Sequence, residues 1–278
     1  MTYVQKLLKS PVVRQIPWQK ISYLVVGALL VGWLLNTPEG LLGKADAVGY
    51  AVCHRIDLRS FHLGDRQFSM CARCTGQYLG AMLGFVFQLS RGRRRVGQPP
   101  RGVLFILGGL ALIWAIDGFN SFLHLQPDLF SRFFIYEPNN TFRVLTGMGL
   151  GLGISAMVLP AFHQTMWKRR SLKPALGGYA SLGGLLALGL ILAGLVLTEN
   201  PLILYPLALI SAAGVLVILT LVYAMVWVML FKLENRFDSL REMTFPLIAG
   251  FATALAQIAA LDYVRFLLTG TWDGFHFG

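Results

Sequence analysis

The sequence is poor in charged residues and in cysteine. Only 13% of its 278 residues are charged, 55% are apolar, and three are cysteines. Soluble domains carry roughly a quarter charged residues, so this composition excludes the soluble globular class and indicates an integral membrane protein. Three cysteines are too few for a disulfide scaffold, and their odd number leaves at least one thiol unpaired or bound to a metal.

Acidic residues are also scarce, with 13 Asp and Glu against 24 Lys and Arg, which gives a formal net charge of +11. In a soluble domain this balance would point to nucleic acid. Here the basic residues fall in short runs between apolar segments, as the positive-inside rule expects, so we predict no nucleic-acid binding. The first twenty residues lack a signal-peptide pattern, because their basic residues precede an apolar run that has no small-residue cleavage site. We therefore expect that run to be a first membrane helix.

Seven segments are long and apolar enough to cross the membrane, since about 30 Å of hydrocarbon takes roughly twenty residues of helix. They predict an all-α fold: a polytopic membrane bundle of about seven transmembrane helices, forming a single membrane domain over residues 1–278. We expect the helices near 19–36, 73–90, 102–124, 142–162, 175–197, 202–231 and 244–268.

The distribution of charge predicts the orientation of this bundle. Sixteen of the 24 Lys and Arg precede the first predicted helix, including Lys6, Lys9 and Arg14, or follow the second, fourth and sixth. Ten of the 13 acids lie in the alternate segments. The N-terminus is therefore expected in the cytoplasm and the C-terminus outside, which makes residues 37–72 an outer loop.

All three cysteines lie in one stretch, Cys53–Gly84, which reads CHRIDLRSFHLGDRQFSMCARCTGQYLGAMLG. The spacing of Cys71 and Cys74 presents two thiolates to one ion, and Cys53 with a histidine completes a set of three cysteines and one histidine that is typical of zinc. Soft thiolate ligands select zinc or copper(I) over calcium or magnesium. We expect zinc or another transition metal, with His54 or His62 as the fourth ligand.

Two other uses of the cysteines stay open. One disulfide could pin the loop to the second helix, and we rank this close behind the metal. In a thiol oxidoreductase linked to quinone, Cys71 and Cys74 would cycle between dithiol and disulfide while Cys53 relays the exchange. We rank that third.

Arginines gather around the same stretch, and their forked guanidinium groups suit phosphate or carboxylate. Asp117 lies near the outer end of the third predicted helix, where an acid at membrane depth is a functional candidate. We name it as the candidate catalytic residue, with a salt bridge to Arg73 or Arg143 as its alternative role. The predicted anion-binding residues are Arg55, Arg59, Arg73, Asn140 and Arg143.

Glycines four residues apart, at 76, 80 and 84, lie on one face of the second predicted helix. Small residues of this kind let membrane helices approach closely. The fourth predicted helix carries glycines at 147, 149, 151 and 153 and is its expected partner. This pairing would bring Cys71 and Cys74 toward Arg143.

Residues 50–155 resemble the domain-of-unknown-function 2085 family of prokaryotic multi-pass membrane proteins. The resemblance rests on CHR, RSF and CARCTG, and then on DG, PNN, R and TG. The matching positions are Cys53, His54, Arg55, Arg59, Ser60, Phe61, Cys71, Ala72, Arg73, Cys74, Thr75, Gly76, Asp117, Gly118, Asn139, Asn140, Arg143, Thr146 and Gly147. The resemblance implies that these residues belong to one site, favours His54 over His62, and implies the inner membrane of a prokaryotic cell.

The function expected from these features is a metal-dependent enzyme that acts on a phosphate-bearing lipid, with membrane lipid as its surroundings and a lipid-borne anion as its substrate. A metal beside phosphate-holding arginines would polarise a phosphoryl oxygen or activate water. Two alternatives remain: a non-catalytic, metal-stabilised accessory or binding subunit of a membrane complex, and the quinone-linked thiol-disulfide oxidoreductase.

Overall fold

The structure is a computed structural model that describes residues 18–125 and 127–274. The predicted N-terminal basic residues Lys6, Lys9 and Arg14 lie outside the described residues, as do the last four residues of the chain.

Each of the seven predicted segments forms a helix, and the observed bounds differ from the predicted ones by at most four residues. The bounds are α3 Trp18–Asn36, α5 Ala72–Ser90, α6 Arg101–Leu123, α8 Asn140–Met166, α9 Tyr179–Leu197, α10 Pro201–Phe231 and α11 Thr244–Thr269.

Five of these helices, α6, α8, α9, α10 and α11, are long and apolar enough to cross a membrane. A sixth span results if α3 is joined to α4, Gly40–Val52, across a bend of 104°. Helix α5 does not reach the same hydropathy, because Arg73, Gln77 and Gln88 interrupt its apolar face. The chain is thus a multi-pass membrane protein, whereas the seventh crossing and the orientation of the termini stay predictions.

Helices α5 and α8 are in close backbone contact along their glycine faces, as predicted. A methyl group added at Gly80 would lie 2.5 Å from the carbonyl oxygen of Met148, and one at Gly76 would meet that of Val144. On α8, Gly147 and Gly151 approach the carbonyl oxygens of Arg73 and Gln77 in the same way. This contact fixes the start of α5, with its two cysteines, against the start of α8.

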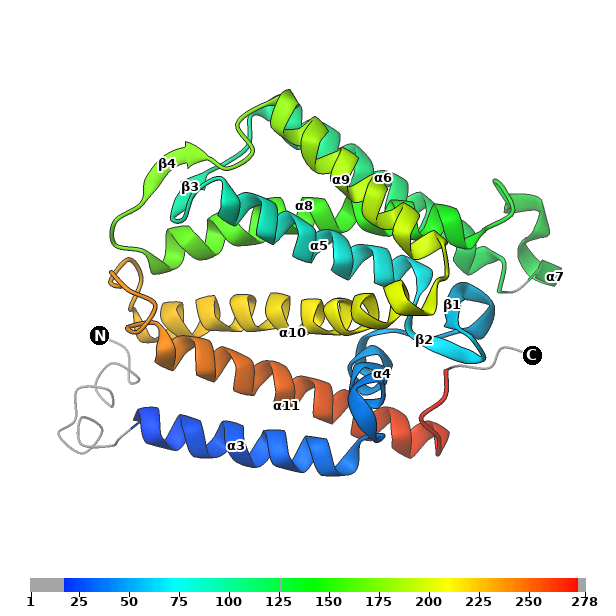
Figure 1. The fold of residues 1–278 in the computed structure, drawn as a ribbon, viewed down its shortest axis with the longest axis horizontal. Helices are drawn as coiled ribbons and strands as arrows, with labels where there is room; N and C mark the ends of the chain where they lie inside the picture. The colour runs from blue at the N-terminus through cyan, green and yellow to red at the C-terminus, as the bar shows by residue number, and fades with distance from the viewer. Residues whose placement is uncertain (1–17, 126, 275–278) are drawn as a thin grey trace.

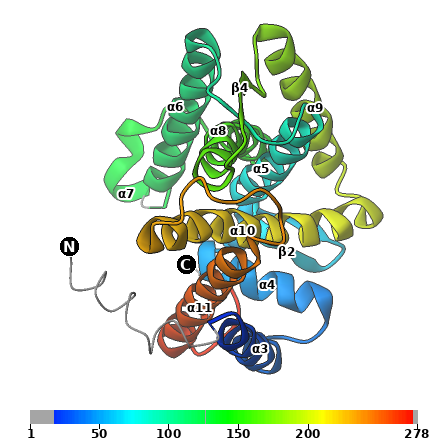
Figure 2. The ribbon, with the colours of Figure 1, turned by 90° about the vertical axis from the view of Figure 1, so that its left-hand side faces the viewer.

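The remaining helices build layers on this pair (Figures 1 and 2). Helices α6 and α9 cover one side of α8, while α10 packs on the opposite side of α5. Helix α11 packs against α10, and α3 packs against α11. The first and last described long helices, α3 and α11, are therefore neighbours.

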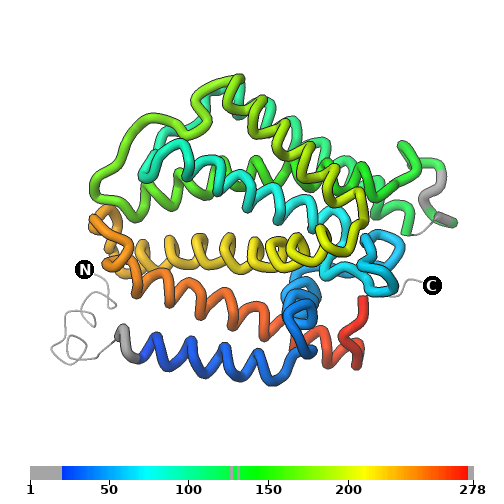
Figure 3. The backbone as a smooth tube through the Cα atoms, in the orientation of Figure 1, coloured from blue at the N-terminus to red at the C-terminus, as the bar shows by residue number. Residues whose placement is uncertain are grey.

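The predicted outer loop 37–72 is mostly regular structure, including a β-hairpin that the all-α prediction did not include. Helix α4 is followed by a short 3₁₀ helix, η1 Asp57–Arg59, and by antiparallel strands β1 Ser60–Leu63 and β2 Arg66–Cys71. Phe61 and Phe68 are buried against α5, α8 and α10, so the hairpin closes this end of the bundle (Figure 3). Its turn includes Gly64, whose φ of +62° is accessible to glycine without strain.

A second pair of short strands joins the two loops at the other end of the bundle. β3 Arg95–Gly97 runs parallel to β4 Ser171–Pro174. Two further short helical turns, α7 Pro127–Phe130 and η2 Ser131–Phe133, follow α6.

Candidate metal centre and arginine cluster

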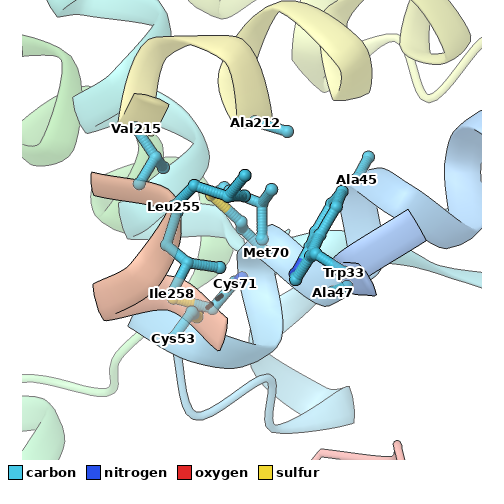
Figure 4. Close-up of a cluster of buried hydrophobic side chains, with 11 residues drawn as sticks. Trp33, Ala45, Ala47, Cys53, Met70, Cys71, Ala212, Val215, Leu255 and Ile258 are labelled. Atoms are coloured by element: carbon cyan, nitrogen blue, oxygen red, sulfur yellow. Dashed lines mark hydrogen bonds between the residues drawn. The ribbon is translucent and has the colours of Figure 1, made fainter. Parts of the chain in front are cut away.

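The three cysteines meet at one point, where α4, β2 and α5 join. Cys53 directly follows α4, Cys71 ends β2 and is the residue before α5, and Cys74 lies in the first turn of α5. Their sulfurs all lie within 4.8 Å of one another, and none forms a disulfide. Cys53 and Cys71 are buried beside Ile258 of α11 (Figure 4). This is a spacing at which one ion can contact all three sulfurs.

Hydrogen bonds within the cluster give the thiols different pKa values. The backbone N–H groups of Cys71 and Arg55 donate to Sγ of Cys53, at 3.3 and 3.4 Å. Hydrogen bonds from the Cys53 and Cys74 thiols hold the pKa of Cys71 well below its usual range. The same pairing with Cys71 raises the pKa of Cys53 to about 12. One thiolate is therefore stabilised, and removing the other protons requires a cation to offset the repulsion.

Neither candidate histidine joins this group at the same mutual distance. Among the described residues, the cluster of potential ligands contains the three cysteines alone. Burial lowers the pKa of His54, which adjoins Cys53 in the chain. His62 lies in β1, where its Nε2 contacts Oδ1 of Asp57 at 3.0 Å. The fourth ligand stays a prediction.

Asp117 is tied to Arg73, the residue between the two cysteines of the α5 start. Arg73 donates to Oδ2 of Asp117 from Nε at 2.9 Å and from Nη2 at 2.5 Å. Thr146 donates to the same oxygen at 3.2 Å, and the Tyr136 hydroxyl donates to Oδ1 at 2.5 Å. Since both oxygens of this buried carboxylate accept hydrogen bonds, the geometry favours the salt-bridge role for Asp117 over the activation of water.

Tyr136 is a member of this site that sequence reasoning missed. It lies in the connection between η2 and α8, and no spacing motif marks it. Burial, together with its hydrogen bond to Asp117, raises the pKa of Tyr136 to about 12. The tyrosine thus binds Asp117 as a neutral donor.

Three of the predicted arginines surround this single carboxylate. Arg59 donates to the carbonyl oxygen of Ser121 at 2.8 Å, and Arg143 donates from Nη1 to Oδ1 of Asn140 at 2.9 Å. Burial, and the positive charges of Arg143 and Arg73, lower the pKa of Arg59 to about 10. We call Arg59, Arg73 and Arg143 the arginine cluster.

Positive charge exceeds negative charge in this cluster. Arg143 is only 6% exposed, and its buried Nε has no hydrogen-bond partner among the described residues. Asn140 connects the cluster to the hairpin, because its Nδ2 donates to the carbonyl oxygen of Ser60 at 3.3 Å. Three guanidinium groups thus share one carboxylate whose oxygens are already occupied, which favours an additional anion.

Arg55, by contrast, belongs to a separate ion pair. Its Nη2 lies 3.6 Å from Oδ1 of Asp46, and its Nη1 donates to the carbonyl oxygen of Trp272 at 3.2 Å. Asp46 also binds Arg66 at 2.5 Å. The structure therefore separates Arg55 from the other predicted anion-binding residues.

One arginine that sequence reasoning did not assign to the site stabilises the Cys53 loop. Arg265 of α11 donates from Nη1 to the carbonyl oxygens of Tyr50 and Cys53, at 2.5 and 2.6 Å. Its guanidinium group also lies 3.9 Å from the centre of the Tyr50 ring. Its only signal in the sequence was a positive charge on the outer half of an apolar helix.

Comparison with known proteins places this site within a recognised family. The family described as predicted membrane protein (DUF2085) matches residues 53–157, which include the three cysteines, the arginine cluster and Asp117. An uncharacterized protein of Methanothermobacter thermautotrophicus is 31% identical over 112 residues, or 40% of this chain and 88% of the relative. An uncharacterized protein of Methanocaldococcus jannaschii is 25% identical over 123 residues, or 44% of this chain and 71% of the relative. No solved structure matches significantly. The chain belongs to the domain-of-unknown-function 2085 family of predicted membrane proteins.

Proposed function

We propose that this protein is a membrane-embedded binding protein for the phosphate headgroup of a lipid, organised by a metal centre. Cys53, Cys71 and Cys74 would hold the metal, most favourably zinc, and Arg59, Arg73 and Arg143 would hold the phosphate. The observation that carries the proposal is the excess of positive charge: three clustered guanidinium groups and one carboxylate that is already hydrogen-bonded.

The metal and the arginines are coupled through the backbone of α5. Arg73 lies between Cys71 and Cys74, so fixing the two thiolates on one ion also fixes the helical turn that presents its guanidinium group. Three thiolates with a net negative charge suit a divalent transition metal. A bound metal supplies structural rigidity here, as in closed zinc sites.

The charge of the cluster defines the expected headgroup. Three arginines and one carboxylate leave a net charge of about +2, and a divalent metal with three thiolates beside them lowers it to about +1. An anionic phosphate headgroup offsets this remaining charge. The expected ligand is therefore a lipid with an anionic phosphate headgroup, such as phosphatidic acid.

Binding is tested with the purified protein in lipid nanodiscs, made of phosphatidylcholine with or without phosphatidic acid. A ligand that binds only the folded state raises the melting temperature. The expected result is a rise with phosphatidic acid that is lost in Arg59→Gln and in Arg143→Gln. Arg66→Gln is the matched control, since Arg66 pairs with Asp46 outside the cluster. An equal rise in all four proteins would refute the proposal.

A second candidate, a metal-dependent enzyme acting on the same lipid, is favoured by one observation. Three clustered sulfurs leave one position of a tetrahedral ion for water or substrate, as in catalytic zinc sites. Release of inorganic phosphate from phosphatidic acid by the metal-loaded protein would support this candidate. The loss of that release in Cys74→Ser, with binding retained, would separate catalysis from binding.

A further inference from the structure

A cavity of about 890 Å³ lies at the opposite end of the bundle from the cysteines. One wall is a stripe of α5 formed by Met82, Phe85, Val86 and Leu89, which recur on one face of the helix. The stripe is about 10 Å long, because each helical residue rises about 1.5 Å. Apolar side chains of α8 and α10 form the facing walls. The interior therefore suits a hydrocarbon chain.

The mouth of this cavity is basic. Arg93, Arg94 and Arg241 lie among its lining residues, and Asp238 is the one acid among them. Asp238 is already paired, with Nζ of Lys168 at 3.6 Å and Nε of Arg169 at 3.5 Å. Asp238 therefore does not neutralise the three guanidinium groups, and the mouth of the cavity is positively charged.

One of these arginines is held in place, while the other two are available. Arg94 lies 4.3 Å above the Trp167 ring and donates to the carbonyl oxygen of Asp238 at 2.6 Å. Arg93 and Arg241 are exposed, and their guanidinium groups make no hydrogen bond or ion pair with any other residue in the part of the chain that the structure describes.

We propose that this arginine-rimmed cavity binds an anionic phospholipid, with an acyl chain along the α5 stripe and the phosphodiester between Arg93 and Arg241. The apolar interior of the cavity suits the acyl chain of such a lipid, and the basic mouth suits its anionic headgroup. A zwitterionic lipid fits less well, because its own ammonium group brings positive charge to a positive rim. The site is separate from the metal centre and does not depend on the function proposed for it.

The rim is tested by native mass spectrometry of the delipidated full-length protein with phosphatidylglycerol or phosphatidylcholine of identical chains. Wild type should bind phosphatidylglycerol more tightly. The double variant Arg93→Gln, Arg241→Gln should weaken phosphatidylglycerol binding about 30-fold, since each basic side chain contributes about 1 kcal/mol near a charged lipid. The matched control, Lys173→Gln with Arg236→Gln, removes the same charge from exposed positions outside the cavity and should change the affinity less than about twofold.

The apolar part is tested by narrowing the cavity. Val86 is 62% exposed, so Val86→Trp should fold normally while its ring occupies the groove and weakens phosphatidylglycerol binding about tenfold. The matched control is Val226→Trp on α10, at an exposed position that does not line the cavity.

The proposal is overturned if the two lipids bind equally, or if the control pair at 173 and 236 weakens binding as much as the rim pair, because the arginines would then attract membrane surface charge alone. It is also overturned if Val86→Trp binds as wild type does. Arg59→Gln and Arg143→Gln, which test the phosphate site at the cysteine end, should leave this affinity unchanged, so the two proposals fail separately.

Discussion

Arg73 binds Asp117 through two nitrogens, Nε at 2.9 Å and Nη2 at 2.5 Å, and so connects the cysteine-bearing turn of α5 to α6. Asp117 is 1% exposed, and the side chain of Arg73 is 14% exposed. The pair is thus removed from water, and each charge offsets the other. Two neighbouring arginines share the same carboxylate at longer range.

Replacing Asp117 with Asn should destabilise the fold by about 3–5 kcal/mol, because it leaves a buried guanidinium group without its counter-charge. The free energy of unfolding, measured by denaturant titration in detergent, checks this. Asp57→Asn is the control: Asp57 contacts His62 at the surface, where removing a polar pair costs less than about 1 kcal/mol. Equal effects of the two variants would mean that the Arg73–Asp117 pair contributes no more than a surface pair.

The protein purified without a polyhistidine tag should carry about one transition metal ion per chain, as expected for a site with three cysteine ligands. Elemental analysis measures this, and the double variant Cys71→Ser, Cys74→Ser should reduce the metal to background. Full retention of metal by the double variant would place the ion elsewhere. Absence of metal from wild type grown in metal-replete medium would favour a disulfide or redox role for the thiols.

Gly80→Leu should lower the melting temperature strongly, because any side chain at this position meets the backbone of Met148. Overpacking in a core usually costs about 1–3 kcal/mol, and a contact with backbone cannot be relieved by a change of rotamer. Gly183→Leu on α9 is the matched control, since a side chain there meets nothing within 4 Å. Similar melting temperatures for both variants would contradict the tight α5–α8 contact.

Stability should fall at high pH through Tyr136. Its pKa is raised from 10.0 to about 12 in the folded protein, so its contribution is fully present below pH 10 and is lost as the pH rises through 12. Tyr136→Phe removes the titrating hydroxyl and should flatten the fall in unfolding free energy between pH 10 and 12. The same slope in both proteins would show that other groups dominate in this range.

The orientation of the bundle is tested with single added cysteines and a membrane-impermeant maleimide on intact cells. A cysteine at Asp65, in the hairpin turn, should react from outside, and one at Arg236, between α10 and α11, should not. Both positions are exposed, so burial does not explain a difference. Labelling at position 236 but not at 65 would reverse the predicted topology.

The helices were predictable because each is a long apolar run, and the α5–α8 contact was predictable because glycine spacing reports a close approach. The expectation that α5 crosses the membrane gave too little weight to its polar residues. Arg73 and two glutamines lower its mean hydropathy below that of the other long helices. The β1–β2 hairpin does not follow from the sequence pattern, because its strands are only four and six residues long and lie in a polar stretch between membrane helices.

In the candidate site, the three cysteines of the motif lie together, as their spacing predicts. The hydrogen-bond partners of the neighbouring polar residues could not be predicted from spacing. Arg73 with Asp117 was one of two stated options, whereas Tyr136 reaches Asp117 from a connection without a pattern. Arg55 is predicted to join the cluster because it lies in the same stretch as the cysteines. Its backbone has a positive φ of 49°, and its side chain pairs with Asp46 instead. Such choices depend on backbone direction, which sequence distance does not define.

The support of the Cys53 loop by Arg265 has a consequence for biosynthesis. The carbonyl oxygens that Arg265 binds belong to residues made early, while Arg265 itself emerges 191 residues after Cys74. At about 5–20 residues per second, the ribosome takes about 10–40 s to cover that distance. Helix α3 is synthesised still earlier relative to α11, its neighbour in the fold. All three cysteines are therefore synthesised before the arginine that stabilises the Cys53 loop. During this interval their thiols are open to a metal ion or to oxidation.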